Sequence, residues 1–249
     1  MILRAVPAVT RAAAILRLLG RARAPMGVKA ISQELGLIPS TALHILRALV
    51  VEELVKVDPL TKHYSLGAGV LSLARTALRS NDFPTLVQPG LDALSRRYGV
   101  TAIGLELPNL QHMIGVALSR TEAPMRLHVD VGSRFPALIS ATGRCLAAFT
   151  DYPKAEIEKR FRALRWNNAP SYEAWSKEVE TARRQGFSIA RGNYIAGVTI
   201  VAVPVPNARG PISRSLASVG IAGQLDRARS VELARDMQDT AKTVAASLA

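Results

Sequence analysis

A glycine and a proline three residues apart constrain the fold of this chain most strongly. Apolar residues recur at helical spacing over residues 28–35 and again over 39–50, and Gly36 and Pro39 stand between the two stretches. Glycine favours the left-handed backbone that ends a helix, and proline is accepted in the first turn of the next one. The sequence therefore predicts two short helices joined by a tight turn, with another helix over 10–19 before them.

A β-hairpin is predicted after the second of these helices. Two extended runs, 54–57 and 62–66, flank Asp58-Pro59-Leu60-Thr61. Aspartate at the first position of such a turn and proline at the second are both favoured. Helix, tight turn, helix and hairpin in this order are typical of a winged helix-turn-helix, which places its second helix in the major groove of DNA.

The second helix and the hairpin carry the candidate DNA contacts. An apolar stripe from Ala42 to Leu49 should pack on the first helix and leave the opposite side for DNA. Hydroxyls near the helix start suit phosphates, an arginine suits guanine, and leucine suits a thymine methyl. The predicted DNA-binding residues are Ser40, Thr41, Leu43, His44 and Arg47 in the helix, with Lys56, Lys62 and His63 in the hairpin. The alternative for any one of them is a solvated side chain on a small helical domain.

The charge of the chain favours a polyanionic partner. Lysine and arginine number 32 against 19 acidic residues, a net charge of +13. Residues 1–80 hold eleven basic and four acidic side chains, so positive charge is about twice as dense there as in the remainder. This is the distribution that a DNA-binding N-terminal part requires. A protein that is basic throughout, for no local reason, is the alternative.

Beyond a candidate boundary at Asn81-Asp82-Phe83-Pro84 the pattern changes to strands mixed with helices. Strands are predicted over 101–107, 113–118, 126–131, 198–205 and 215–222, and helices over 67–78, 85–98, 141–149, 154–164, 172–185 and 226–248. Such an arrangement is typical of an α/β or α+β sheet domain. The predicted domains are a winged helix-turn-helix at 1–66, a linker helix at 67–81 and a sheet domain at 82–249.

Several classes of protein are disfavoured by the sequence. Cys145 is the single cysteine, which excludes an intrachain disulfide, and no phosphate loop, paired carboxylates or metal-spaced histidines occur. We therefore predict no catalytic residue, no metal and no cofactor. An enzyme with a dyad of Cys145 and a histidine is the rival hypothesis, but Leu146, Ala147 and Ala148 beside the thiol favour a buried structural cysteine. No signal peptide or membrane-spanning stretch is present, so a cytoplasmic bacterial protein, associated with the nucleoid through DNA, is expected.

The order of these motifs resembles the IclR family of transcriptional regulators over nearly the whole chain. The resemblance rests on Val6–Leu16, Leu35–Thr41, Tyr64–Gly67, Gly132–Pro136, Ala141–Gly143, Leu146–Phe149, Gly186-Phe187, Gly197-Val198 and Ala202–Val205. It implies that residues 82–249 form a GAF-like effector-binding domain and that the N-terminal domains form a homodimer, which often assembles into tetramers. The DNA partner would then be a pseudo-palindromic operator, and the apolar face of 67–78 is the candidate contact between copies. Small organic acids and aromatic catabolites are the implied ligands, and repression and activation both stay open.

The sequence departs from the family pattern at positions that contact DNA and at positions that bind the effector. The recognition helix has Leu43-His44 where the family often has a His-Arg pair, so the DNA sequence preference cannot be carried over. Positions that usually hold polar ligand contacts are apolar here, whereas main-chain amides at a helix start could still bind a carboxylate. The predicted effector-binding residues are Phe135, Ala141, Thr142, Ala190, Ile200, Ala217 and Val219. They predict an effector with an aromatic or otherwise apolar body and at most one carboxylate. Ordinary core packing at these positions, in a regulator of the same fold without a ligand, is the alternative.

Overall fold

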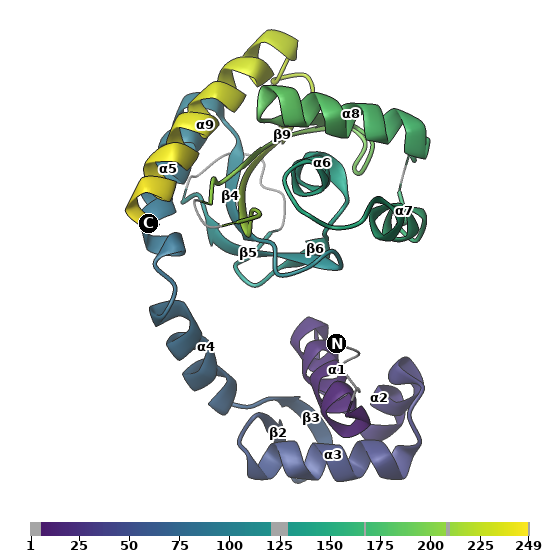
Figure 1. Cartoon of the computed structure of the whole chain (residues 1–249). Helices are drawn as coiled ribbons and strands as arrows, with labels where there is room; N and C mark the ends of the chain where they lie inside the picture. The colour runs from purple at the N-terminus through teal and green to yellow at the C-terminus, as the bar shows by residue number, and fades with distance from the viewer. Residues whose placement is uncertain (1–5, 121–128, 167, 208–209, 249) are drawn as a thin grey trace. The chain divides into compact units, whose positions relative to one another are not determined.

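The computed structural model describes residues 6–120, 129–166, 168–207 and 210–248 (Figure 1). The chain divides into two compact units, Met1–Asn81 and Asp82–Ala249. The first unit includes the helix after the hairpin. A separate winged-helix domain at 1–66 and a linker helix at 67–81 therefore stay a prediction.

The first unit is a helix-turn-helix with a small sheet. It contains α1 (Pro7–Arg21), α2 (Val28–Leu35), α3 (Pro39–Val51) and α4 (Gly69–Arg79), and the strands β1 (Met26–Gly27), β2 (Val55–Val57) and β3 (His63–Leu66). The strands form an antiparallel sheet in the order β1-β3-β2. Gly36 ends α2 with φ 62°, the left-handed conformation that the sequence predicts for it.

A single apolar core holds this unit together. Its buried members come from α1, α2, α3 and both strands of the hairpin: Ile15, Leu19, Ile31, Leu46, Leu49, Val55 and Tyr64. Gly67 lets the chain leave the hairpin close to the end of α3. A Cβ on Gly67 would lie 2.1 Å from the carbonyl oxygen of Glu53, so a larger residue would force the two segments apart.

The second unit is a sheet covered by helices on both faces. The strands β4 (Thr101–Glu106), β5 (His112–Leu118), β6 (Arg134–Pro136), β7 (Ser188–Arg191), β8 (Val198–Pro204) and β9 (Arg214–Ile221) form an antiparallel sheet in the order β6-β5-β4-β9-β8-β7. The helices are α5 (Phe83–Tyr98), α6 (Ser140–Ala148), α7 (Lys154–Arg162), α8 (Tyr172–Gln185) and α9 (Arg227–Leu248). Figure 1 shows α5 and α9 side by side on one face of the curved sheet, with α6 on the other. The predicted fold class is confirmed.

Alternation along the strands sorts the residues between two cores. On β9, Ala217 and Val219 join the cluster under α6, whereas Leu216 joins the cluster under α5 and α9. On β8, Ile200 faces α6 and Val201 faces α9 in the same way. The α6 side of the sheet therefore carries the residues that the sequence assigns to an effector.

The structure departs from the sequence-based prediction at short edge strands. β1, β6 and β7 were not predicted, since two to four residues at a sheet edge carry too little alternation to identify. The strand predicted over 126–131 falls partly outside the described residues, and residues 129–131 are not in a strand.

Among the described residues, no single helix is long and apolar enough to cross a membrane. The pair α2 and α3 passes that test only when taken together, and the two helices are bent by 113° at the break between them.

Candidate functional site

The outward face of α3 presents the residues predicted to read DNA. Ser40, His44 and Arg47 are exposed and recur at helical spacing, whereas Thr41 and Leu43 are half-buried. The opposite stripe of the helix (Ala42, Leu46, Leu49) is buried against the rest of the unit. Within the described ranges no carboxylate pairs with Arg47 or His44. The guanidinium of Arg47 is therefore available to an acceptor outside the chain.

The wing is the hairpin of β2, β3 and the turn between them, and its basic groups point to solvent. Lys56, Lys62 and His63 are all exposed. Asp58 closes the turn: its Oδ1 accepts hydrogen bonds from the amides of Thr61 at 2.8 Å and Leu60 at 2.9 Å. These two amides hold the pKa of the Asp58 carboxyl below its ordinary value. The turn is thus a fixed support for the basic residues around it.

A small cavity, which we call the α6 cavity, lies between α6 and the sheet of the second unit. Its volume is ≈ 60 Å³. The lining residues are Ile103, Leu105, Met113, Val129, Phe135, Ile139, Ser140, Thr142, Tyr194, Ile195, Ile200, Ala217 and Val219. Three of these side chains carry a hydroxyl and, among the described residues, none is charged. The cavity therefore suits a mostly apolar molecule with few polar atoms.

Ser140 gives the α6 cavity an unusual polar group. Its side chain is 2% exposed, its φ is 63°, and its Oγ has no hydrogen-bond partner among the described residues. It is the first residue of α6, a helix whose start has no side-chain cap. Gly143 N donates a hydrogen bond to Ile139 O at 3.0 Å. The amides that come before Gly143 at the start of α6 have no carbonyl of the helix to which they could donate. A buried donor and a helix start therefore meet where a carboxylate could be bound.

Close packing fixes α6 at this position. A Cβ on Gly143 would lie 2.1 Å from the carbonyl carbon of Leu138, so only glycine allows the helix to approach the preceding segment. At the other end, Arg144 pairs with Glu178 of α8, and Arg183 Nε donates to Ala148 O at 3.0 Å. These contacts hold α6 between the cavity and α8.

Five of the seven residues predicted to bind an effector line the α6 cavity, namely Phe135, Thr142, Ile200, Ala217 and Val219. Ala141 and Ala190 are buried in the surrounding core but do not line it. Sequence reasoning missed Ser140 and Tyr194. The predicted helix began one residue late, at Ala141, and a serine at a helix start is a signal that would have identified Ser140.

The loop that supplies Tyr194 and Ile195 joins β7 to β8 and is bounded by two glycines. Gly192 has φ 69° and Gly197 has φ 75°. Asn193 O accepts a hydrogen bond from Asn168 N at 3.2 Å, which ties this loop to the segment after α7. Trp166 of that segment belongs to an aromatic cluster with residues of α7 and α8. The ring centre of Phe161 lies 5.5 Å from that of Trp166 and 5.0 Å from that of Trp175. Trp175 therefore belongs to the same core cluster as the residues that line the cavity, and Trp166 packs against this cluster.

Arg191, next to Ala190 on β7, has several hydrogen-bond partners. Its guanidinium donates to Leu225 O at 2.8 Å, Ser230 Oγ at 2.9 Å and Thr199 Oγ1 at 3.3 Å. These acceptors lie on β8 and around the start of α9. The arginine thus joins the sheet edge to α9 and faces away from the α6 cavity.

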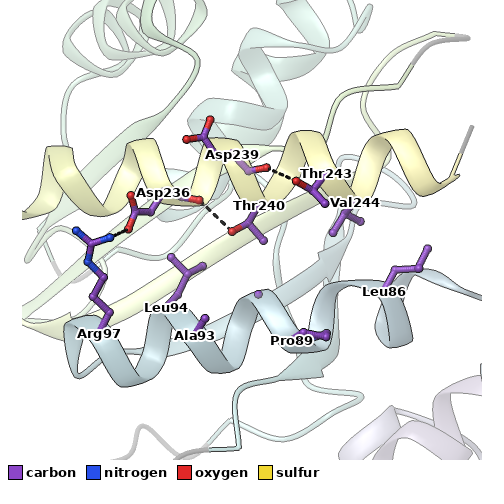
Figure 2. A pocket seen from close by; sticks show the side chains of 11 residues that line it. Leu86, Pro89, Ala93, Leu94, Arg97, Asp236, Asp239, Thr240, Thr243 and Val244 are labelled. Carbon is purple, nitrogen blue, oxygen red and sulfur yellow. Dashed lines mark hydrogen bonds and ion pairs between the residues drawn. The ribbon is translucent and has the colours of Figure 1, made fainter.

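A larger hollow of ≈ 600 Å³ lies open between α5 and α9 (Figure 2). Figure 2 shows Arg97 pointing at Asp236, at 2.7 Å, and the hydroxyls of Thr240 and Thr243 turned back on their own helix. A Cβ on Gly90 would lie 2.4 Å from Thr240 Cγ2. Because these polar groups are already satisfied and the helices nearly touch, we assign this hollow to the packing of α5 on α9.

The chemistry of an enzyme has little support in this arrangement. Cys145 is fully buried, and burial raises the pKa of its thiol to about 12. Its Sγ lies 3.4 Å from the carbonyl oxygen of Ala202. Over the described ranges, no group of three or more histidine, cysteine or acidic residues is placed to hold a metal ion.

Comparisons with known proteins agree with this geometry. The model of the IclR helix-turn-helix domain matches residues 8–59, and that of the bacterial transcriptional regulator IclR C-terminal domain matches residues 75–246. The glycerol operon regulatory protein of Streptomyces griseus is 28% identical over 98% of this chain and 97% of its own length. The crystal structure of an IclR transcriptional regulator from Alicyclobacillus acidocaldarius has a TM-score of 0.83 and 25% identity, covering 97% of this chain and 98% of that one. An IclR homologue from Microbacterium hydrocarbonoxydans complexed with 4-hydroxybenzoate shares the fold, with a TM-score of 0.76 and 19% identity over 97% and 98% of the two chains.

Proposed function

The chain belongs to the IclR family of bacterial DNA-binding transcriptional regulators, and on this premise we propose that a small carboxylic acid in the α6 cavity controls its binding to DNA. The observation that carries the proposal is the buried Oγ of Ser140 at the uncapped start of α6, for which the described part of the chain offers no hydrogen-bond partner. The acid would accept from this hydroxyl and from the first amides of the helix, where the helix dipole favours a negative charge.

The body of the effector should be apolar. Seven lining residues come from the sheet, namely Ile103, Leu105, Met113, Phe135, Ile200, Ala217 and Val219, and Phe135 provides an aromatic wall. A hydroxyl or keto oxygen buried against them without a partner would cost about 1–3 kcal/mol. We therefore propose a benzoate-like acid rather than an acid of pyruvate or glyoxylate size. The protein of the same fold that was crystallised with 4-hydroxybenzoate contains an acid of this class.

The size of the cavity favours a second candidate function, regulation without a ligand. A volume of ≈ 60 Å³ is far below the roughly 300–1,000 Å³ of common ligand sites. A benzoate would fit only if the Tyr194 loop moved outward, for which Gly192 and Gly197 provide the flexible ends. A binding experiment decides between a cavity that opens for a ligand and a core that stays closed.

On DNA we propose a homodimer on a pseudo-palindromic operator, with assembly into tetramers left open. Ser40, Thr41, Leu43, His44 and Arg47 would contact the major groove, and Lys56, Lys62 and His63 the backbone. One helix reads only a few base pairs, so a second copy supplies the specificity. The exposed apolar face of α4, with Leu71 72% and Leu78 50% exposed, is the surface that a second copy would cover.

The test of the effector proposal is a titration of the full chain followed by tryptophan fluorescence, since Trp175 belongs to the core cluster around the cavity and Trp166 packs against it. The probes are benzoate, 4-hydroxybenzoate, pyruvate and glyoxylate. We expect saturable binding of the two aromatic acids and weaker binding of the two keto acids. Tighter binding of pyruvate or glyoxylate would refute the apolar-body proposal, and no binding of any probe would favour the candidate without a ligand.

Two serine variants sharpen this experiment. Ser140→Gly removes the hydroxyl and relaxes the left-handed backbone, and it should weaken benzoate binding about tenfold, the equivalent of one hydrogen bond to a charged group. The matched control is Ser218→Ala, because Ser218 is another fully buried serine with an unpartnered Oγ, and it lies on the opposite face of the sheet. It should bind benzoate as the unmodified protein does.

A further inference from the structure

The tip of the wing exposes an apolar side chain, Leu60, which is not among the proposed DNA contacts. Leu60 is 91% exposed, more than any other large apolar residue of the described chain. Its neighbours in the wing do not shield it, because Pro59 and Thr61 are exposed as well. A single exposed apolar side chain is common on protein surfaces, so the place of Leu60 in the wing, its fixed backbone and the charges around it carry the argument.

The turn holds Leu60 in one place. Asp58 Oδ1 accepts from the amides of Leu60 and Thr61, and Asp58 N and O both bond across the hairpin, to His63 O and Lys62 N at 2.9 Å each. Pro59 further restricts the backbone just before the tip. Little conformational entropy is therefore lost when Leu60 makes a contact, which is the property expected of a preformed binding element.

The charges around Leu60 indicate the kind of partner. Lys56, Lys62 and His63 are exposed on the same hairpin, and Asp58 is the single acidic residue within 54–66. An apolar tip between basic flanks matches the minor groove of DNA, whose walls are deoxyribose and whose rims are phosphate. A hairpin arm of three residues extends about 10 Å, and the minor groove is about 7.5 Å deep.

We propose that Leu60 enters the minor groove beside the site where α3 lies in the major groove, and that it makes the protein prefer A·T pairs there. The reason is chemical. Guanine places a 2-amino donor on the floor of the minor groove, and an apolar side chain would bury this donor without an acceptor. The inference rests on DNA binding by α3 and is independent of any effector.

The experiment uses the full chain and a duplex selected from a randomised library by the unmodified protein. The pairs flanking each α3 half-site are then set to A·T, G·C or inosine·C, because inosine lacks only the 2-amino group of guanine. We expect the unmodified protein to bind the A·T and inosine·C duplexes about tenfold more tightly than the G·C duplex. Equal binding of all three would overturn the proposal.

Two variants separate the apolar contact from charge. Leu60→Ala should bind the three duplexes alike, with an unchanged dependence of affinity on salt, and Leu60→Met should keep the preference. Lys62→Ala, the matched control, should keep the preference but reduce the salt slope by about 0.9. A Leu60→Ala variant that binds and discriminates as the unmodified protein does would overturn the role of Leu60. If the unmodified protein selected no duplex at all, DNA binding itself would fail, which is a distinct result that overturns both conclusions.

Discussion

Cys145 shows how the environment of one residue decides its chemistry. The thiol is fully buried among apolar residues, and this burial raises its pKa to about 12, only partly offset by the charge of Arg144. The reactive species of cysteine is the thiolate, so the folded protein should be inert. We expect no reaction with a thiol reagent such as DTNB at pH 8 in the native state and one equivalent in guanidinium.

The same shift predicts how stability depends on pH. Because the native thiol ionises at a higher pH than the unfolded one, whose pKa is near 9.0, folding favours the neutral form. The contribution of Cys145 is complete below pH 9 and is lost as the pH rises toward 12. Cys145→Ser and the unmodified protein should therefore differ in the shape of their stability curves only above pH 9. Rapid labelling of native protein at pH 8 would contradict the buried thiol.

Ser140 marks the limit of what single residues reveal in the sequence. The hydrophobic pattern predicts an amphipathic helix over 141–149, whereas every residue of α6 is buried. Phe135 and Thr142, both predicted to bind an effector, line the same cavity. Neither the burial of Ser140 nor its φ of 63° follows from local sequence, because both depend on the approach of α6 to the segment around Leu138. The sequence can place a serine at the start of α6, but the burial of its hydroxyl in the cavity is visible only in the folded chain.

At the scale of elements, the sequence predicts long helices well and short edge strands poorly. Helices with a stop residue or a long period are predicted to the residue, as for Val28–Leu35 and Tyr172–Gln185. Glycine follows each of these two helices with positive φ. The short edge strands β6 and β7 escape prediction because three or four residues carry too little alternation, and their position depends on pairing with β5 and β8.

The helix α4 has an amphipathic sequence without a surface to bury. None of its residues is buried, and Leu71 and Leu78 share one face. If a second copy covers this face, Leu71→Glu should weaken dimerisation at least tenfold, because one substitution changes both sides of a symmetric contact. We expect monomers in light scattering at micromolar concentration, where the unmodified protein is a dimer.

The control for α4 is on the opposite face of the same helix. Thr76 is exposed there, and Thr76→Glu adds the same charge away from the face of Leu71 and Leu78. This variant should stay dimeric. Monomers in both variants would mean that the added charge, and not the loss of an apolar contact, separates the copies.

At the scale of the whole molecule, the proposal joins a DNA-reading unit to a ligand-binding unit. Both units can be assigned to domains of the IclR family from the sequence, because the order of the motifs is sufficient for that assignment. The effector is harder to predict, because the volume and the polar groups of the α6 cavity are set by packing between β4, β5, β8, β9 and α6. A coupling between the two units must therefore be measured as a free energy and not inferred from the fold.

Thermodynamic linkage makes this coupling testable in both directions. If benzoate changes the affinity of the full chain for its selected duplex by some factor, the duplex must change the affinity for benzoate by the same factor. We expect a factor of about 5–150, the usual range of such coupling. The first value comes from DNA titrations with and without saturating benzoate, and the second from fluorescence titrations with and without saturating duplex.

Ser140→Gly should raise the benzoate concentration that is required to change DNA affinity, and it should leave the DNA affinity without benzoate unchanged. Benzoate that binds tightly but changes DNA affinity by less than twofold would show that the α6 cavity has no regulatory role, since a ligand with equal affinity for both states shifts no equilibrium.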